Sequence, residues 1–187
     1  MIIEHLSISR RRLALILGAL AMLGPFSIDT IFPAFAVMEN ALQVDKVAMQ
    51  QTISMYLLGY AAMSLFHGPI SDAIGRKKVL LAGIVLFTLS SIGAALAGDM
   101  TTMLVYRALQ GLSAGVGLIV GRAVVRDCRE GDDAQRLMSQ ISMIFGIAPA
   151  IAPVIGGVLL NLLGWRSIFW VMLIQALALI VWVRSRL

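Results

Sequence analysis

The segments MQQTISMYLLGYAAMSLFHGPIS (residues 49–71), DAIGRKK (72–78) and VLLAGIVLFTLSSIGAALA (79–97) follow one another directly in the chain. The first and third segments contain no Asp, Glu, Lys or Arg, whereas the middle segment carries one acid and three bases. An α-helix needs about 20 apolar residues to cross the hydrocarbon core of a bilayer. The pattern therefore predicts two membrane-spanning helices joined by a turn that is too short to hold a soluble domain.

The same pattern extends along the whole chain. Hydrophobic residues make up 59% of the sequence and charged residues 13%, and the mean hydropathy is +0.91. An ordinary soluble domain has about 25% charged residues. We therefore expect an all-α membrane protein that forms a single domain over residues 1–187. Its six predicted spans lie at about residues 13–38, 49–71, 79–97, 103–125, 137–160 and 168–183.

Basic side chains are distributed unequally between the two sides of the membrane that this topology defines. One side receives only Lys46 and Arg166, and the other collects Arg10, Arg11, Arg12, Arg76, Lys77, Lys78, Arg122, Arg126, Arg129, Arg136, Arg184 and Arg186. By the positive-inside rule the crowded side is cytoplasmic, and both termini lie there. Because these bases sit at helix ends rather than on one continuous face, we expect a lipid bilayer and no nucleic acid as partner.

The residue types needed for common catalytic sites do not occur in suitable patterns. His5 and His67 are the two histidines, and neither lies in an H-E-x-x-H sequence, so we expect no metal site and no cofactor. At the cytoplasmic end of the second span, His67 is interpreted as an interfacial residue. The sequence also contains no G-x-x-x-x-G-K-[ST] phosphate loop, which an ATP-driven pump would need. These observations argue against an enzyme.

The six spans divide into two triplets that resemble each other. A shift of 89 positions lays Gly68, Asp72, Gly75 and Lys77 over Gly157, Asn161, Gly164 and Arg166. Each set falls at the end of the middle helix of its triplet, and the two ends face opposite sides of the membrane. This is the arrangement that a three-plus-three inverted repeat predicts, because three helices per unit turn the second copy over.

Two charged residues lie inside predicted spans. Asp29 in the first span is flanked by Pro25 and Pro33. An acid in hydrocarbon costs about 2.5 kcal/mol or more, so it normally faces an internal cavity and has a function there. The alternative is a structural hydrogen bond where the prolines disturb the helix. We expect Arg107, near the outer end of the fourth span, to approach Asp29 directly or through substrate, and the alternative is that Arg107 reaches the outer interface.

The turn GPISDAIGRKK (68–78) combines small residues, an acid and adjacent bases. It resembles the signature G-x-x-x-D-x-x-G-R-[KR]-[KR] between the second and third helices of the major facilitator superfamily. In that family the segment acts as a cytoplasmic gate, whose acid pairs with its arginine and with a helix of the other half of the protein. The resemblance assigns this role to Gly68, Asp72, Gly75, Arg76 and Lys77.

Three further segments resemble motifs of the same family. RALQG (107–111) is similar to the fourth-helix pattern R-x-x-[QH]-G, whose arginine is linked to proton coupling, and DTIFP (29–33) resembles the first-helix element D-x-x-x-P. APVIGG (152–157) is similar to the antiporter signature G-P-x-x-G-G, with alanine in place of its first glycine. Prolines in this helix remove backbone donors and permit a bend, and glycines allow close helix contact. The antiporter helix is thus predicted from Pro149, Pro153, Gly156 and Gly157.

Residues 25–29, 125–127 and 167–170 look most like the bicyclomycin and chloramphenicol resistance branch of bacterial drug/proton antiporters. The resemblance implies the N-terminal half of a twelve-helix protein in the bacterial inner membrane. It also implies proton-coupled export of small drug-like molecules by alternating access, with Asp29 and Arg107 serving protons and substrate. A C-terminal six-helix half or a second copy of this chain would complete the cavity. The alternative is a truncated membrane module that does not transport.

Overall fold

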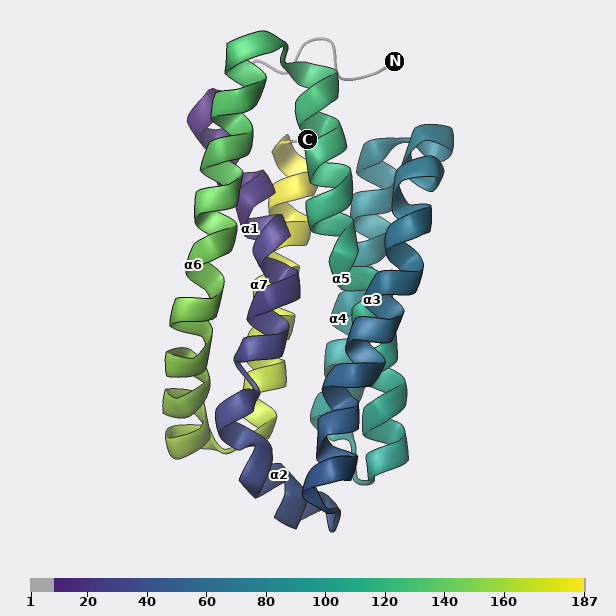
Figure 1. The fold of residues 1–187 in the computed structure, drawn as a ribbon, viewed down its shortest axis with the longest axis vertical. Helices are drawn as coiled ribbons and strands as arrows, with labels where there is room; N and C mark the ends of the chain where they lie inside the picture. The colour runs from purple at the N-terminus through teal and green to yellow at the C-terminus, as the bar shows by residue number, and fades with distance from the viewer. Residues whose placement is uncertain (1–8, 187) are drawn as a thin grey trace.

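The fold is a bundle of helices, described for residues 9–186 in a computed structural model (Figure 1). All regular elements in these residues are helical, as expected. They are α1 (Arg10–Asp29), the 3-10 helix η1 (Phe32–Ala34), α2 (Phe35–Leu42), α3 (Lys46–Ile74), α4 (Arg76–Leu96), α5 (Met100–Cys128), α6 (Gly131–Leu163) and α7 (Arg166–Arg186).

The first predicted span is not one continuous helix, and this corrects the expectation for residues 13–38. Helix α1 ends at Asp29, and η1 and α2 follow after a turn at Thr30 and Ile31. Pro33 explains the break, because it has no N–H to donate to the carbonyl oxygen of Asp29 and its ring clashes with that carbonyl. Pro25 lies within α1 without ending it. The acid of the first span therefore lies at an interruption of the helix.

Most of the helices are suited to cross a membrane. By length and composition, five segments are candidate spans: the stretch Arg10–Leu42, which contains α1, η1 and α2, and the helices α4, α5, α6 and α7. Helix α3 is 29 residues long but is not among them. The polar residues that lower its hydropathy include Gln50, Gln51, Thr52, Ser54, Ser64 and His67. Together with α3, the bundle has the six-helix architecture that the sequence predicts.

The helix contacts follow the predicted inverted repeat. The middle helix of each triplet packs against the first helix of the other, α3 against α5 and α6 against α1. The two first helices, α1 and α5, also contact each other, and so do the two third helices, α4 and α7. Exchanging the two triplets therefore turns the α3–α5 contact into the α6–α1 contact, and it leaves the α1–α5 and α4–α7 contacts unchanged.

The two middle helices also end alike. Gly75 after α3 and Gly164 after α6 have positive φ angles of 103° and 81°. Each donates its N–H four residues back, to Ser71 and Leu160 respectively, at 3.1 Å. Glycine adopts this conformation without the steric penalty of a Cβ, and it lets the next helix begin at once. These two glycines are 89 positions apart, the offset of the sequence repeat, and lie at opposite ends of the bundle (Figure 1).

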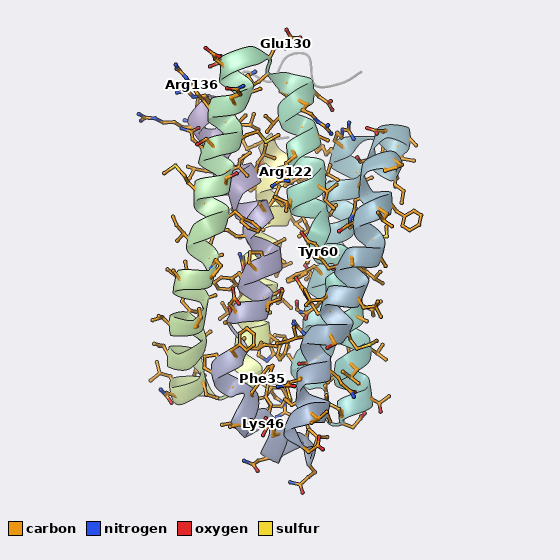
Figure 2. All side chains as sticks on the ribbon, in the orientation of Figure 1. Phe35, Lys46, Tyr60, Arg122, Glu130 and Arg136 are labelled. Carbon is orange, nitrogen blue, oxygen red and sulfur yellow. The ribbon has the colours of Figure 1, made fainter. Side chains whose placement is uncertain are left out.

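One end of the bundle holds most of the connections rich in bases. The start of α1, the α3–α4 turn, the α5–α6 turn and the end of α7 all lie at the top of Figure 1. Figure 2 labels Glu130 and Arg136 at this end and Lys46 at the other. The grouping of these connections agrees with the charge asymmetry from which the sequence predicts a cytoplasmic side.

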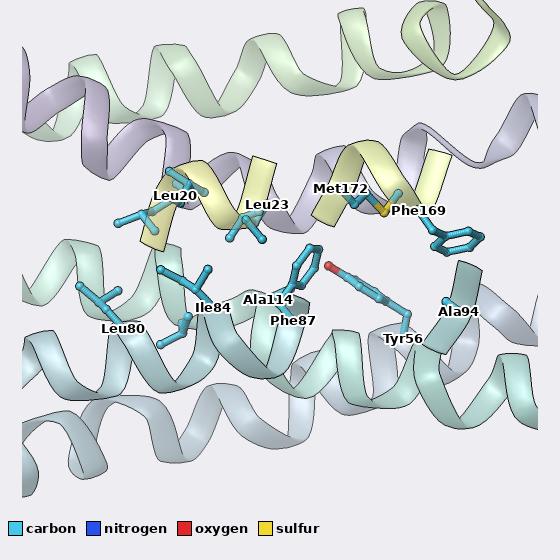
Figure 3. Packing of buried hydrophobic residues seen from close by; sticks show 14 of the residues in the cluster. Leu20, Leu23, Tyr56, Leu80, Ile84, Phe87, Ala94, Ala114, Phe169 and Met172 are labelled. Carbon is cyan, nitrogen blue, oxygen red and sulfur yellow. The ribbon is translucent and has the colours of Figure 1, made fainter. Parts of the chain in front are cut away.

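The buried core is apolar and lies between α1, α3, α4, α5 and α7. Leu20, Leu23, Ile84, Phe87 and Met172 converge there (Figure 3). Large apolar side chains also cover the outside, including Leu57, Leu58 and Leu65 of α3 and Val154, Leu162 and Leu163 of α6. Apolar residues inside and outside are what a membrane-embedded bundle requires, because lipid tails solvate the outer side chains.

Candidate functional site

Arg107 lies in the interior of the bundle, with its side chain 0% exposed. Its Nη1 donates to the carbonyl oxygen of Ser27 at 3.2 Å and to Oε1 of Gln110 at 2.9 Å. The guanidinium also lies over the ring of Tyr56, 4.4 Å from the ring centroid. Dipoles and an aromatic face, rather than an acid, therefore surround this buried cation. Its Nη2 has no hydrogen-bond partner.

A hydrogen-bonded network extends from Arg107 to three other helices. The hydroxyl of Tyr56, in α3, donates to the carbonyl oxygen of Gly24 at 3.0 Å and lies 2.7 Å from the hydroxyl of Ser27, both in α1. Gln110 continues the network to α4, where its Nε2 donates to Ser91 at 2.8 Å. Figure 3 shows the hydroxyl of Tyr56 pointing into the interior of the bundle, toward the ring of Phe87. A buried network whose members are mostly satisfied holds the four helices in one register.

Asp29 does not form the expected direct ion pair with Arg107. The ion pairs within residues 9–186 are Arg10–Asp133, Arg76–Asp72 and Arg76–Asp127. Arg107 instead binds the carbonyl oxygen of Ser27. At about 100° per helical residue, the side chain of Asp29 points about 160° away from that of Ser27. Asp29 is partly exposed at the end of α1, and its carboxylate is available to a partner other than Arg107.

The predicted gate residues lie together at the basic end of the bundle. Arg76 forms ion pairs with Asp72 of the same turn and, through Nε at 2.9 Å, with Asp127 at the end of α5. Lys77 donates to the carbonyl oxygen of Arg184 in α7 at 3.1 Å. The turn after α3 is thus tied to the ends of α5 and α7, while the side chain of Asp72 remains 63% exposed.

The surroundings of the gate include one open position and one acid that the sequence did not predict. A Cβ placed on Gly68 would meet no atom of the described residues within 4 Å, so Gly68 borders open space.

Asp127 was not predicted from the sequence as a partner of Arg76. The signal for it is an acid just after the fourth predicted span, on the same side of the membrane as the turn. Its pairing depends on how α5 packs beside α3, which no local pattern specifies.

The predicted antiporter helix, α6, presents a face of small residues to α1. Ala148 and Ala152 are buried against Phe26, and Gly156 follows one turn later. A Cβ on Gly156 would collide with the carbonyl oxygen of Thr30, whereas one on Gly157 would meet nothing within 4 Å. Pro149 and Pro153 lie within α6, which stays helical throughout. Helix α6 therefore packs closely against the interruption that follows Asp29.

His67 is not an interfacial residue, which corrects the sequence-based interpretation. Its side chain is 3% exposed, and Nδ1 has no hydrogen-bond partner. The reason is the close packing of α3 on α5, where Gly115 lies beside the imidazole. His5 is outside the described residues. Within residues 9–186 there is no group of three or more His, Cys, Asp and Glu side chains that could hold a metal ion.

The inverted repeat of apolar helices, with an acid at a helix break and a buried arginine network, defines a multi-pass membrane domain of the secondary-transporter type. Comparison with known proteins specifies the family. The chain belongs to the Major Facilitator Superfamily, whose sequence profile matches residues 14–186.

Individual relatives agree with this assignment. The chain is 39% identical over 180 residues to the uncharacterized MFS-type transporter YdgK of Bacillus subtilis, covering 95% of this chain and 45% of YdgK. It is 34% identical to multidrug resistance protein D of Escherichia coli, covering 87% of this chain and 41% of that protein. It is 32% identical to the bicyclomycin resistance protein homolog of Haemophilus influenzae, covering 84% of this chain and 39% of that protein. The last two names agree with the predicted bicyclomycin and chloramphenicol resistance branch.

A solved structure agrees with the fold. The crystal structure of a D-xylose–proton symporter matches with a TM-score of 0.81 and 17% identity, covering 94% of this chain and 48% of the symporter. The chain spans less than half of the length of each of these proteins. This length fits the predicted N-terminal six-helix half.

Proposed function

We propose that this chain is one half of a proton-coupled secondary transporter that exports small drug-like molecules by alternating access. The second half is a C-terminal six-helix unit or a second copy of the chain, and the membrane is the bacterial inner membrane with both termini cytoplasmic. Relatives named for multidrug and bicyclomycin resistance support the substrate class. The charge asymmetry supports the orientation.

Asp29 carries the proton-coupling part of the proposal. It is an acid in an apolar chain, it lies where α1 is interrupted, and it has no ion pair within residues 9–186. Acids in membrane spans normally serve ion or substrate pathways, and interrupted helices form such sites in transporters. We assign Asp29 to the exchange of a proton for substrate, and Arg107 to shaping that site from the buried side.

The turn after α3 and helix α6 have supporting roles in this proposal. Asp72 pairs with Arg76 and still exposes most of its side chain, so it is suited to a second contact with the other half of the transporter. Helix α6 packs on α1 through Gly156 and leaves Gly157 open. We assign the first group to the cytoplasmic gate and the second to sealing the path between the two halves.

The test is proton-gradient-dependent dye efflux in inverted membrane vesicles that contain this chain together with any second half encoded after it. We expect Asp29→Asn to abolish efflux while the protein remains inserted in the membrane. Asp132→Asn is the matched control, because Asp132 is exposed at the start of α6 and forms none of the ion pairs. Unchanged efflux in Asp29→Asn would refute the assignment of the proton site.

The second candidate function is a truncated membrane module that does not transport. The observation that favours it is the coverage of less than half of each relative. If the unsubstituted chain, with and without a second half, shows no gradient-dependent efflux but inserts normally, the module is the correct description. Efflux by either form rules it out.

A further inference from the structure

Three polar side chains of α3 converge on one glycine of α5. A Cβ on Gly115 would lie 3.5 Å from Cε2 of Tyr60, 3.5 Å from Oγ of Ser64 and 3.5 Å from Nδ1 of His67. Residues 60, 64 and 67 share one face of α3, because their spacings of four and three residues match the helical repeat. Because Gly115 has no side chain, a space about the size of one methyl group lies between them, since a Cβ would meet all three at ordinary contact distance.

This cluster contains polar atoms without protein partners. Nδ1 of His67 has no partner although the side chain is 3% exposed. Leaving such an atom unsatisfied is unfavourable, so buried polar groups without partners call for an explanation. The hydroxyl of Tyr60 forms no hydrogen bond to another residue within 9–186, whereas the hydroxyl of Ser64 donates to the carbonyl oxygen of Tyr60.

Arg122 lies on the same face of α5 as Gly115, seven residues further along. Gly111, on this face too, lies against the backbone of Tyr56, so the face is the one directed toward α3. Arg122 is exposed, lies within electrostatic range of Tyr60 and has no hydrogen bond or ion pair to another described residue. Figure 2 places Tyr60 at mid-height of the bundle and Arg122 nearer to the end with Glu130.

No acid neutralises this region. Asp and Glu are absent from residues 13–28 of α1, 46–71 of α3 and 100–126 of α5, which are the helices around the cluster. The nearest acid along α5, Asp127, is already paired with Arg76. The region therefore combines a free guanidinium and a phenolic hydroxyl as donors with an imidazole, which accepts or donates according to its protonation.

We propose that Tyr60, His67 and Arg122 form a binding site, with its floor at Gly115, for an anionic oxygen group such as a carboxylate, phenolate or phosphate. A guanidinium binds such groups through charge-assisted hydrogen bonds. The site is on the cytoplasmic side of Asp29 and is distinct from it. Along α5, Gly115 and Arg122 lie about 12 and 22 Å beyond Arg107, whose guanidinium binds Ser27 close to Asp29 in the sequence. The ligand is either a small molecule or the phosphate of an anionic lipid.

The site is tested by binding, so the result does not depend on transport. The purified chain in dodecyl maltoside is titrated with 1-naphthoate and with its neutral analogue 1-naphthalenemethanol by calorimetry. We expect naphthoate to bind at least about tenfold more tightly, and Arg122→Gln to weaken its binding by about tenfold or more, as loss of a charge-assisted hydrogen bond predicts. Arg126→Gln, four residues further on the same helix, is the control and leaves binding unchanged.

A second pair of variants tests the space at Gly115 without removing a polar group. Gly115→Ala places a methyl at ordinary contact distance from the three side chains, and Gly121→Ala does so against Leu17 only. Both are therefore expected to fold, and only Gly115→Ala should weaken naphthoate binding. Equal affinity in Arg122→Gln and the unsubstituted chain, or no naphthoate binding at all, overturns the proposal.

Nanodiscs of different lipids distinguish the two sources of the anionic group, a small molecule and a lipid phosphate. In nanodiscs of phosphatidylcholine, naphthoate binding that depends on Arg122 supports the site. If the same binding is lost in nanodiscs of phosphatidylglycerol, the site is confirmed and its ligand is a lipid phosphate. If binding persists in phosphatidylglycerol, the site is confirmed and its ligand is a small-molecule anion.

Discussion

Arg107 donates a hydrogen bond from Nη1 to the backbone carbonyl oxygen of Ser27 at 3.2 Å, which holds its guanidinium away from Asp29. The cation is thus stabilised by peptide and amide dipoles and by the ring of Tyr56. Asp29, the charged residue of the first span, forms no ion pair with any described residue. The two charges that the sequence predicts to approach each other therefore have separate environments within the described residues.

Tyr56 is predicted to stabilise the fold through its hydroxyl. Tyr56→Phe removes the buried hydrogen bonds to Gly24 and Ser27 but keeps the ring under Arg107, so we expect a loss of about 1–3 kcal/mol in the free energy of unfolding. The control is Tyr106→Phe, whose hydroxyl has no hydrogen bond to another described residue. Unfolding of the purified chain by SDS in dodecyl maltoside measures both, and equal losses would contradict the prediction.

Alanine substitutions at two neighbouring glycines of α6 are predicted to have very different effects on stability. Gly156→Ala forces a methyl into the carbonyl oxygen of Thr30 and should destabilise the fold by about 1–3 kcal/mol, as overpacking does. Gly157→Ala meets open space and should leave stability unchanged or slightly raised, because alanine favours the helix. The midpoint of SDS unfolding compares the two variants. A larger loss for Gly157→Ala would show that α6 packs on α1 through a different face.

The two acids that share Arg76 are predicted to be coupled. Asp72→Asn and Asp127→Asn each leave one ion pair in place, so each should cost about 0.2–1 kcal/mol of stability, the range for exposed pairs. The double variant leaves Arg76, 15% exposed, without an acid and should lose more than the sum of the two. A double-mutant cycle on unfolding free energies tests this. Strict additivity would mean that the pairs act independently.

Asp99, the N-cap of α5, is predicted to make stability depend on pH. Hydrogen bonds from the backbone N–H of Thr102, first, and from its hydroxyl lower the pKa of Asp99 below its ordinary value of 3.8. A carboxyl with a lowered folded-state pKa contributes stability above the unfolded value, and this contribution is lost as the pH falls from about 4 through the folded pKa. Unfolding midpoints below pH 5 should decline more steeply for the unsubstituted chain than for Asp99→Asn. Identical pH profiles would exclude this contribution.

Several features of the site were predictable because they depend on neighbours in the chain. The pairing of Asp72 with Arg76 follows from their spacing of four residues, and the matching places of Gly75 and Gly164 after the middle helices follow from the repeat. The break after Asp29 had a local cause in Pro33. Motif resemblance also led to Gly156, although its contact with Thr30 depends on packing.

Other features depended on contacts between helices. The burial of His67, the second ion pair of Arg76 with Asp127, and the binding of Arg107 to Ser27 join residues at least 48 positions apart or depend on such packing. Each requires a particular rotation of one helix about its axis against another. That rotation is set by close approaches such as Gly111 against the backbone of Tyr56, which hydropathy does not encode.

The sequence by itself determined the helical class, the six-helix architecture, the repeat and the family, because membrane insertion depends on apolarity summed over about 20 neighbouring residues. Only the tertiary structure decided which charges meet. Arg107 faces a carbonyl oxygen rather than Asp29, and Arg76 pairs with Asp127 as well as with Asp72. The reason is that apolarity acts along the chain, whereas the pairing of two side chains depends on how packed helices are turned toward each other.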